Sequence, residues 1–247
     1  METTEMGRAE QIDRLMESAS RALAATDYFV SIELSVRSVR LSVATKDWER
    51  LARICLPLQE ARRQVRQAAV DAAEGKVRLI DTPTQLRSAP RPGCYLVQPP
   101  QIGADASGFR VAAWKRRVPV FVLAREPRTR SGRWPIVGVD AVSVRTQVDP
   151  PEGVVADPSL ATGDRCELPI STRWFEAACE QLGDAGIRSV DPSEPAAHRV
   201  EALIERLDAV PEHEKLHQRL AEAARHAIDE PEPTLARRGS LGHPYSF

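Results

Sequence analysis

Apolar residues recur in steps of three and four along the N-terminal part of the chain, with polar turns between the stretches. This spacing places the apolar side chains on one face of a helix and predicts three antiparallel helices. The three stretches are 12–23, 29–43 and 48–72. We therefore expect residues 1–76 to form a helical bundle.

Two of the turns share a pattern. Thr26-Asp27-Tyr28 and Lys46-Asp47-Trp48 each precede an apolar helix. Over residues 11–74 they resemble the turns between helices in tetratricopeptide repeats, and this resemblance implies helical hairpins. The turns stand 20 residues apart, whereas the full repeat of that family has about 34 residues. A plain three-helix bundle is the alternative.

After Gly75 the pattern changes to alternating apolar and polar residues in short, valine-rich runs separated by proline and glycine. Such runs are typical of antiparallel strands. The expected strands are 77–80, 94–98, 109–114, 118–124, 134–140 and 142–148. They predict an antiparallel β-sheet or small barrel at 77–148 and, with the helices, an α+β fold.

The C-terminal part begins with a stretch rich in proline and glycine, 149–170, which predicts an extended connector. Helical spacing resumes near Thr172 and predicts amphipathic helices over 171–229. The remaining residues, 230–247, have little to bury and predict a mobile tail.

Charge is distributed unevenly, although the formal net charge of the 247 residues is only -1. Residues 1–76 hold 12 basic and 12 acidic side chains, 77–148 hold 12 and 4, and 149–247 hold 10 and 19. The predicted sheet is therefore basic and the C-terminal helices are acidic. This division predicts either a surface for an anionic partner or neutralisation of one segment by the other.

The four cysteines are too far apart for a C-x-x-C metal or redox motif and are expected to be buried thiols. The N-terminus lacks the pattern of a signal peptide, and no 18-residue apolar run occurs. We therefore expect a cytoplasmic protein without a membrane partner.

One metal-binding motif occurs in the last predicted helices. His213-Glu214-Lys215-Leu216-His217 has the H-E-x-x-H pattern, which can place two imidazoles on one helix face to hold zinc, with the glutamate as general base. At these five residues the chain resembles the zincin metalloproteases. The resemblance implies His213 and His217 as ligands and Glu214 as the catalytic residue. We favour the alternative, a solvated helix face without zinc, and expect no cofactor.

A second motif precedes and follows the second expected strand. Arg87 and Arg91 form an R-x-x-x-R pair, and Asp105-Ala106-Ser107-Gly108 follows. Together they resemble the PilZ domain, which implies binding of a cyclic dinucleotide whose phosphates the arginines clamp. Because arginine is common throughout the chain, a chance R-x-x-x-R is the alternative.

A basic stretch runs from residue 110 to residue 133 and is interleaved with Phe109, Trp114, Phe121 and Trp134. Arginine with aromatic side chains on a β-domain is a pattern that holds single-stranded nucleic acid. The candidate anion-binding residues in it are Arg110, Lys115, Arg116 and Arg117. We favour the alternative, a solvated basic sheet face that the acidic C-terminal helices neutralise.

No nucleotide-binding glycine loop and no serine-nucleophile motif occurs in the sequence. The sequence therefore favours a non-enzymatic interaction or regulatory protein that binds a protein partner. Binding of nucleic acid or a cyclic dinucleotide is the first alternative, and a zincin-like metallohydrolase is the second.

Overall fold

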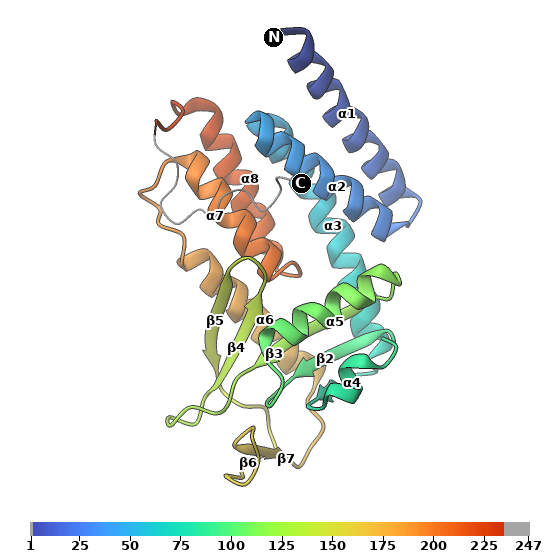
Figure 1. Cartoon of the computed structure of the whole chain (residues 1–247), viewed down its shortest axis with the longest axis vertical. Coiled ribbons are helices and arrows are strands. Elements are labelled where there is room, and N and C mark those ends of the chain that lie inside the picture. Colours follow the sequence, from blue (N-terminus) through green and yellow to red (C-terminus); the bar gives the residue numbers. More distant parts are fainter. Residues whose placement is uncertain (1, 235–247) are drawn as a thin grey trace. The chain divides into compact units, whose positions relative to one another are not determined.

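The computed structural model describes residues 2–234 of the chain, with side chains from residue 7 onward (Figure 1). Of the tail predicted at 230–247, residues 235–247 lie outside this described part. The chain forms two compact units: the described part of the first comprises 2–64, 187–205 and 214–234, and the second comprises 65–186 and 206–213. Among the described helices, none has both the length and the apolar character needed to cross a bilayer.

The first unit is entirely helical. Its N-terminal part confirms the predicted packing of three helices, and α1 with α2 makes an extensive interface. Two more helices come from the C-terminal part of the chain. The helices are α1 (Glu2–Ala24), α2 (Tyr28–Thr45), α3 (Trp48–Ala72) up to Gln64, α7 (Ala196–Ala209) up to Glu205, and α8 (Glu214–Asp229).

The two predicted turns begin helices through the same side-chain chemistry. Asp27 caps α2, because its carboxylate accepts a hydrogen bond from the Val30 amide, and Asp47 accepts one from the Arg50 amide at the start of α3. Arg50 also donates two hydrogen bonds to Asp13 of α1, at 2.8 and 2.9 Å. This pairing joins the first and third helices, and the Arg50 guanidinium holds the pKa of the Asp13 carboxyl below its ordinary value.

The interior face of α2 is more polar than the apolar spacing predicts. Four serines one turn apart are fully buried beside Ile32 and Val39. Ser31 donates a hydrogen bond to the Ala19 carbonyl oxygen of α1 at 3.0 Å. Small side chains let the two backbones approach closely. The four serines are Ser31, Ser35, Ser38 and Ser42.

The second unit is built on one five-stranded mixed sheet, in the order β1-β2-β3-β4-β5. β1 pairs with β2 and β2 with β3 in parallel, whereas β3–β4 and β4–β5 are antiparallel. The predictions of an antiparallel sheet and of a small barrel are therefore wrong. The strands are β1 (Arg78–Ile80), β2 (Gly93–Val97), β3 (Val120–Arg125), β4 (Trp134–Val139) and β5 (Ser143–Val148).

The parallel half of the sheet exists because helices connect its strands. A short helix, α4 (Pro83–Arg87), leads from β1 to β2, and α5 (Gly103–Lys115) leads from β2 to β3. Parallel neighbours need such crossover connections. The predicted strand at 109–114 is therefore wrong, since these residues lie within α5. Its buried residues, Ala106, Phe109 and Ala113, follow helical steps of three and four.

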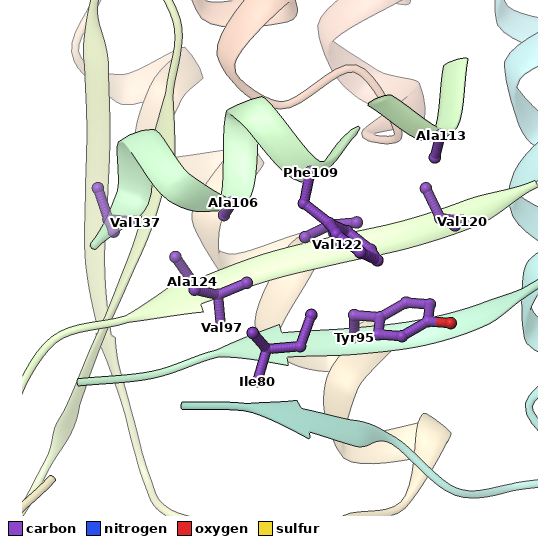
Figure 2. Close-up of a cluster of buried hydrophobic side chains, with 10 residues drawn as sticks. All are labelled: Ile80, Tyr95, Val97, Ala106, Phe109, Ala113, Val120, Val122, Ala124 and Val137. Atoms are coloured by element: carbon purple, nitrogen blue, oxygen red, sulfur yellow. The ribbon is translucent and has the colours of Figure 1, made fainter. Parts of the chain in front are cut away.

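Helices cover both faces of this sheet. On one face, α5 contributes Ala106, Phe109 and Ala113 to a buried cluster with residues of β1 to β4 (Figure 2). Tyr95 packs on Phe109 there, with ring centroids 4.9 Å apart. On the other face, Phe121 of β3 packs edge-on against Phe175 of α6 (Thr172–Arg188), with ring centroids 4.8 Å apart. The second unit is thus a three-layer α/β/α arrangement.

The predicted connector at 149–170 contains a short two-stranded ladder. β6 (Val154–Ala156) and β7 (Asp164–Cys166) pair antiparallel, apart from the main sheet. The connector then returns to the first strand, where the Val77 amide donates to the Ile170 carbonyl oxygen at 2.9 Å. This contact fixes the start of α6 beside the start of β1.

Candidate functional site

Two carboxylates project from one face of α6. Glu180 and Asp184 are four residues apart, so they lie one helical turn from each other. Their side chains are 42% and 35% exposed. The opposite side of the helix carries Phe175 and Leu182, which are buried in the second unit. Because that side is buried, the two carboxylates lie on the partly exposed side of the helix.

His213 lies directly over the backbone of α6, between the two carboxylates. Its side chain is fully buried. The ring reaches this position because residue 183 is glycine: a Cβ atom there would stand 2.0 Å from Cγ of His213. Non-bonded carbon atoms do not come so close, so the contact depends on Gly183.

The three side chains converge on one point. Nε2 of His213 is 3.4 Å from Oε2 of Glu180 and 3.4 Å from Oδ1 of Asp184. One ligand atom from each residue lies within 4.8 Å of the other two. Ligands held at about 2.1 Å from a tetrahedral metal ion are about 3.4 Å from each other. The two separations from the imidazole therefore equal those around a shared metal ion.

Cys179, the residue before Glu180, contributes no thiolate to this cluster. Burial raises the pKa of its thiol well above the ordinary value, and the neighbouring Glu212 and Glu180 act in the same direction. The thiol therefore stays protonated at neutral pH. The cluster offers one nitrogen and two oxygen ligands, a set that suits zinc, manganese or ferrous iron.

The predicted zincin residues lie in different surroundings. His213 stands one residue before α8, and Glu214 is the first residue of that helix. Glu214 accepts a hydrogen bond from Gln59 of α3, 3.4 Å. His217 is also buried, and its Nε2 is 3.3 Å from Nη1 of Arg62. His213 faces carboxylates, whereas His217 faces a guanidinium.

The predicted PilZ-like residues fall in two helices and a loop. Arg87 is the last residue of α4, Arg91 lies in the following loop, and both are exposed. Asp105 is in the first turn of α5, where its carboxylate accepts a hydrogen bond from the Ile102 amide at 2.8 Å. A carboxylate at this position occupies the helix N-terminus that a phosphate would otherwise favour.

The basic stretch divides into exposed and buried members. Lys115, Arg116 and Arg117 are exposed at the C-terminal end of α5. Arg110 is half-buried, and its Nη2 donates a hydrogen bond to the Asp208 carbonyl oxygen at 3.1 Å. The four basic residues are therefore not equivalent as anion contacts.

Two further arginines of the stretch are paired with Asp164 of β7. Arg125, whose side chain is fully buried, is 3.3 Å from Asp164, and Arg128 is 2.9 Å from it. The guanidinium of Arg125 also stacks on Trp134, 3.9 Å from Cζ to the ring centroid. Asp164, which lies in the connector at 149–170, therefore partly neutralises the positive charge of Arg125 and Arg128.

Comparison of the chain with family models, with curated proteins and with solved structures gave no match in any of the three. The chemistry of the site has to be inferred from its own residues. Of the cluster, the sequence indicated only His213. The pair Glu180 and Asp184 has helical i, i+4 spacing, but such acidic pairs are common on amphipathic helices, and Gly183 was the one unusual residue beside them.

Proposed function

We propose that the protein binds a divalent transition-metal ion through Glu180, Asp184 and His213. The observation that carries this proposal is the convergence of the three ligand atoms, with both imidazole-to-carboxylate separations at 3.4 Å. Gly183 supports it as well, because that residue gives the imidazole its place against the helix. Three protein ligands leave further coordination positions for water or a substrate.

The same cluster has a purely structural alternative. A protonated imidazole between two carboxylates would join residues 206–213 to α6 through charge-assisted hydrogen bonds. The two cases differ in what removal of a carboxylate does. In the metal site, loss of either carboxylate lowers metal affinity, whereas in the ion pair the protein binds no metal and only its stability changes.

The experiment is a calorimetric titration of chelator-treated protein with zinc. We expect one zinc ion per chain, and at least a tenfold weaker dissociation constant after Asp184→Asn or Glu180→Gln, because each variant removes a charged ligand. His198→Gln is the matched control. His198 is also buried beside a carboxylate, with Nδ1 3.1 Å from Glu194, but it lies outside the cluster of Glu180, Asp184 and His213. Absence of stoichiometric binding, or equal loss in the control, would contradict the proposal.

We also propose that the second unit binds a protein partner on the outer face of α5. One exposed stripe of this helix carries Gly108, Val111 and Ala112, and Val111 is 48% exposed. A helix on the surface of an α/β/α unit normally has a polar outer face. The exposed Lys115, Arg116 and Arg117 follow at its end, which suits an apolar partner segment with acidic residues beside it.

This second function is tested by photo-crosslinking from position 112 in cells, followed by purification of the crosslinked partner. We expect binding of that partner to fall at least tenfold in Val111→Asp, and to weaken with salt in the wild type. Glu126→Gln, on an exposed pair with Arg145 away from this stripe, is the control. A partner that binds Val111→Asp as tightly as the wild type would argue against this face.

A further inference from the structure

A second site, separate from the metal ligands, lies at the end of the parallel strands of the second unit. Arg125 is the last residue of β3, and its side chain is fully enclosed. Nε donates to Gln98 at 3.2 Å, and Nη1 donates at 3.3 Å to both Asp164 and the Thr162 carbonyl oxygen. Nη2 is buried and has no hydrogen-bond partner among residues 7–234.

The charges of this cluster do not balance. Asp164 receives hydrogen bonds from Arg125, from Arg128 and from the indole N–H of Trp134. Two guanidiniums therefore share one carboxylate. Burial lowers the pKa of Arg125, but a guanidinium in a protein keeps its proton at neutral pH. The enclosed group thus has an excess positive charge and one unsatisfied donor, which together favour an additional or a larger anion.

The position in the fold favours a ligand as well. In sheets of this type ligands bind outside the carboxyl ends of the parallel strands. Gln98 directly follows β2, and Arg125 is the last residue of β3. Asp164 belongs to the separate β6–β7 ladder. Its segment can therefore move without breaking a hydrogen bond of the five-stranded sheet.

We propose that Arg125 and Arg128 form an oxyanion-binding site, which the Asp164 carboxylate occupies in this structure as an internal ligand. A carboxylate or phosphate group of a small molecule displaces Asp164 and takes over its hydrogen bonds with Arg125, Arg128 and the Trp134 indole. A planar pair of oxygens suits the fork of a guanidinium. A phosphate has an additional oxygen for Nη2 of Arg125.

The test follows the Trp134 indole N–H signal by two-dimensional NMR, during titration with inorganic phosphate and, separately, with formate. Trp134→Phe identifies the signal among the four tryptophans of the chain. We expect a saturable shift in the wild type, and at least tenfold tighter binding in Asp164→Asn, which removes the competing carboxylate. A response to phosphate alone supports a phosphorylated ligand, and a response to formate alone supports a carboxylate ligand.

Two comparisons keep the test decisive. Glu167→Gln removes another carboxylate near the same ladder, one that pairs with the exposed Arg165, and we expect it to bind anions as the wild type does. Arg128→Gln, at a half-buried position, should weaken the wild-type response at least tenfold even if Asp164→Asn does not fold. Absence of a saturable shift with both anions in the wild type and in every folded Asp164 variant would overturn the proposal.

Discussion

The imidazole of His213 rests on the α-carbon of Gly183, so closely that a methyl group at position 183 would stand 2.0 Å from Cγ of the ring. The adjacent turn holds Glu180 and Asp184, the two carboxylates that face Nε2 of the same imidazole. The imidazole thus packs against the backbone of α6, and the two carboxylates of the same helix lie beside its Nε2. One small residue therefore controls whether the three ligands meet.

Gly183→Ala should separate these ligands. The added methyl group displaces the His213 ring, so we expect zinc affinity to fall at least tenfold and stability to fall by about 1–3 kcal/mol, as for an overpacked core. Gly186→Ala is the matched control on the same helix, because a Cβ there makes ordinary contacts, the nearest at 3.4 Å. It should keep zinc binding and gain up to about 1 kcal/mol of helix stability. Calorimetry and urea unfolding measure both.

The indole N–H of Trp134 donates to Asp164 within a buried network. Trp134→Phe removes this donor and leaves the carboxylate with one hydrogen bond fewer, so we expect a loss of about 1–3 kcal/mol in the free energy of unfolding. Trp174→Phe is the control, since that indole donates to the Asp149 carbonyl oxygen at an exposed site. Urea denaturation distinguishes the two. Equal losses of stability would show that the buried hydrogen bond of Trp134 contributes no more than the exposed one of Trp174.

The sequence predicted the N-terminal and C-terminal helices well because each of them has its own apolar period. Asp27 and Asp47 start α2 and α3 as the turn chemistry requires. The predicted strand at 109–114 failed for a local reason. Phe109, Val111 and Ala113 alternate with polar or small residues as in a strand, yet α5 has apolar residues on both sides, so the two periods could not be distinguished over six residues.

That error also reversed the predicted direction of the β2–β3 pair. Without a helix between β2 and β3, short strands in succession suggest antiparallel neighbours; with it, the crossover makes the pair parallel. The candidate sites were harder to predict still. Asp164 is 39 residues from Arg125 in the chain, and His213 is 33 residues from Glu180 and 29 from Asp184. Contacts between residues so far apart in the chain depend on the tertiary fold, and neither contact leaves a short motif in the sequence.

Because Phe109 and Val111 lie in a helix and not in a strand, we expect substitutions at the two positions to affect stability differently. In a strand, Phe109 and Val111 would share one face, but in α5 Phe109 is buried against Tyr95 while Val111 is 48% exposed. We expect Phe109→Ala to lower the free energy of unfolding by about 3–5 kcal/mol and Val111→Ala to change it by less than about 0.5 kcal/mol. Thermal or urea unfolding gives both values. Similar losses for the two would contradict the helix.

The four cysteines should differ in reactivity. Burial raises the pKa of Cys55 and of Cys94 to about 12 and also raises that of Cys179 well above its ordinary value, so their thiolates are scarce at pH 8. Cys166 is the one of the four that is not fully buried. We expect a thiol reagent to label one cysteine of the native protein first, and Cys166→Ser to abolish that fast phase. Fast labelling of Cys55 or Cys94 in the folded protein would disagree with the structure.

The Asp13–Arg50 pair should make stability depend on pH in the acid range. Arg50 lowers the pKa of Asp13 in the folded state, so the pair stabilises the protein above the unfolded-state pKa of about 3.9 and this contribution is lost as the pH falls through the folded-state value. Because both side chains are partly exposed, we expect only about 0.5–1 kcal/mol at pH 7. Asp13→Asn should therefore be less stable than the wild type at pH 7, and the difference should shrink as the pH falls below 4. Urea unfolding of both proteins between pH 7 and pH 2.5 measures this difference in stability.

Glu17→Gln is the control for the acid dependence. Glu17 lies on the same helix in an exposed pair, 3.9 Å from Arg21, so this variant should change stability little at pH 7. A stability difference for Asp13→Asn that persisted at the lowest pH would contradict the assignment.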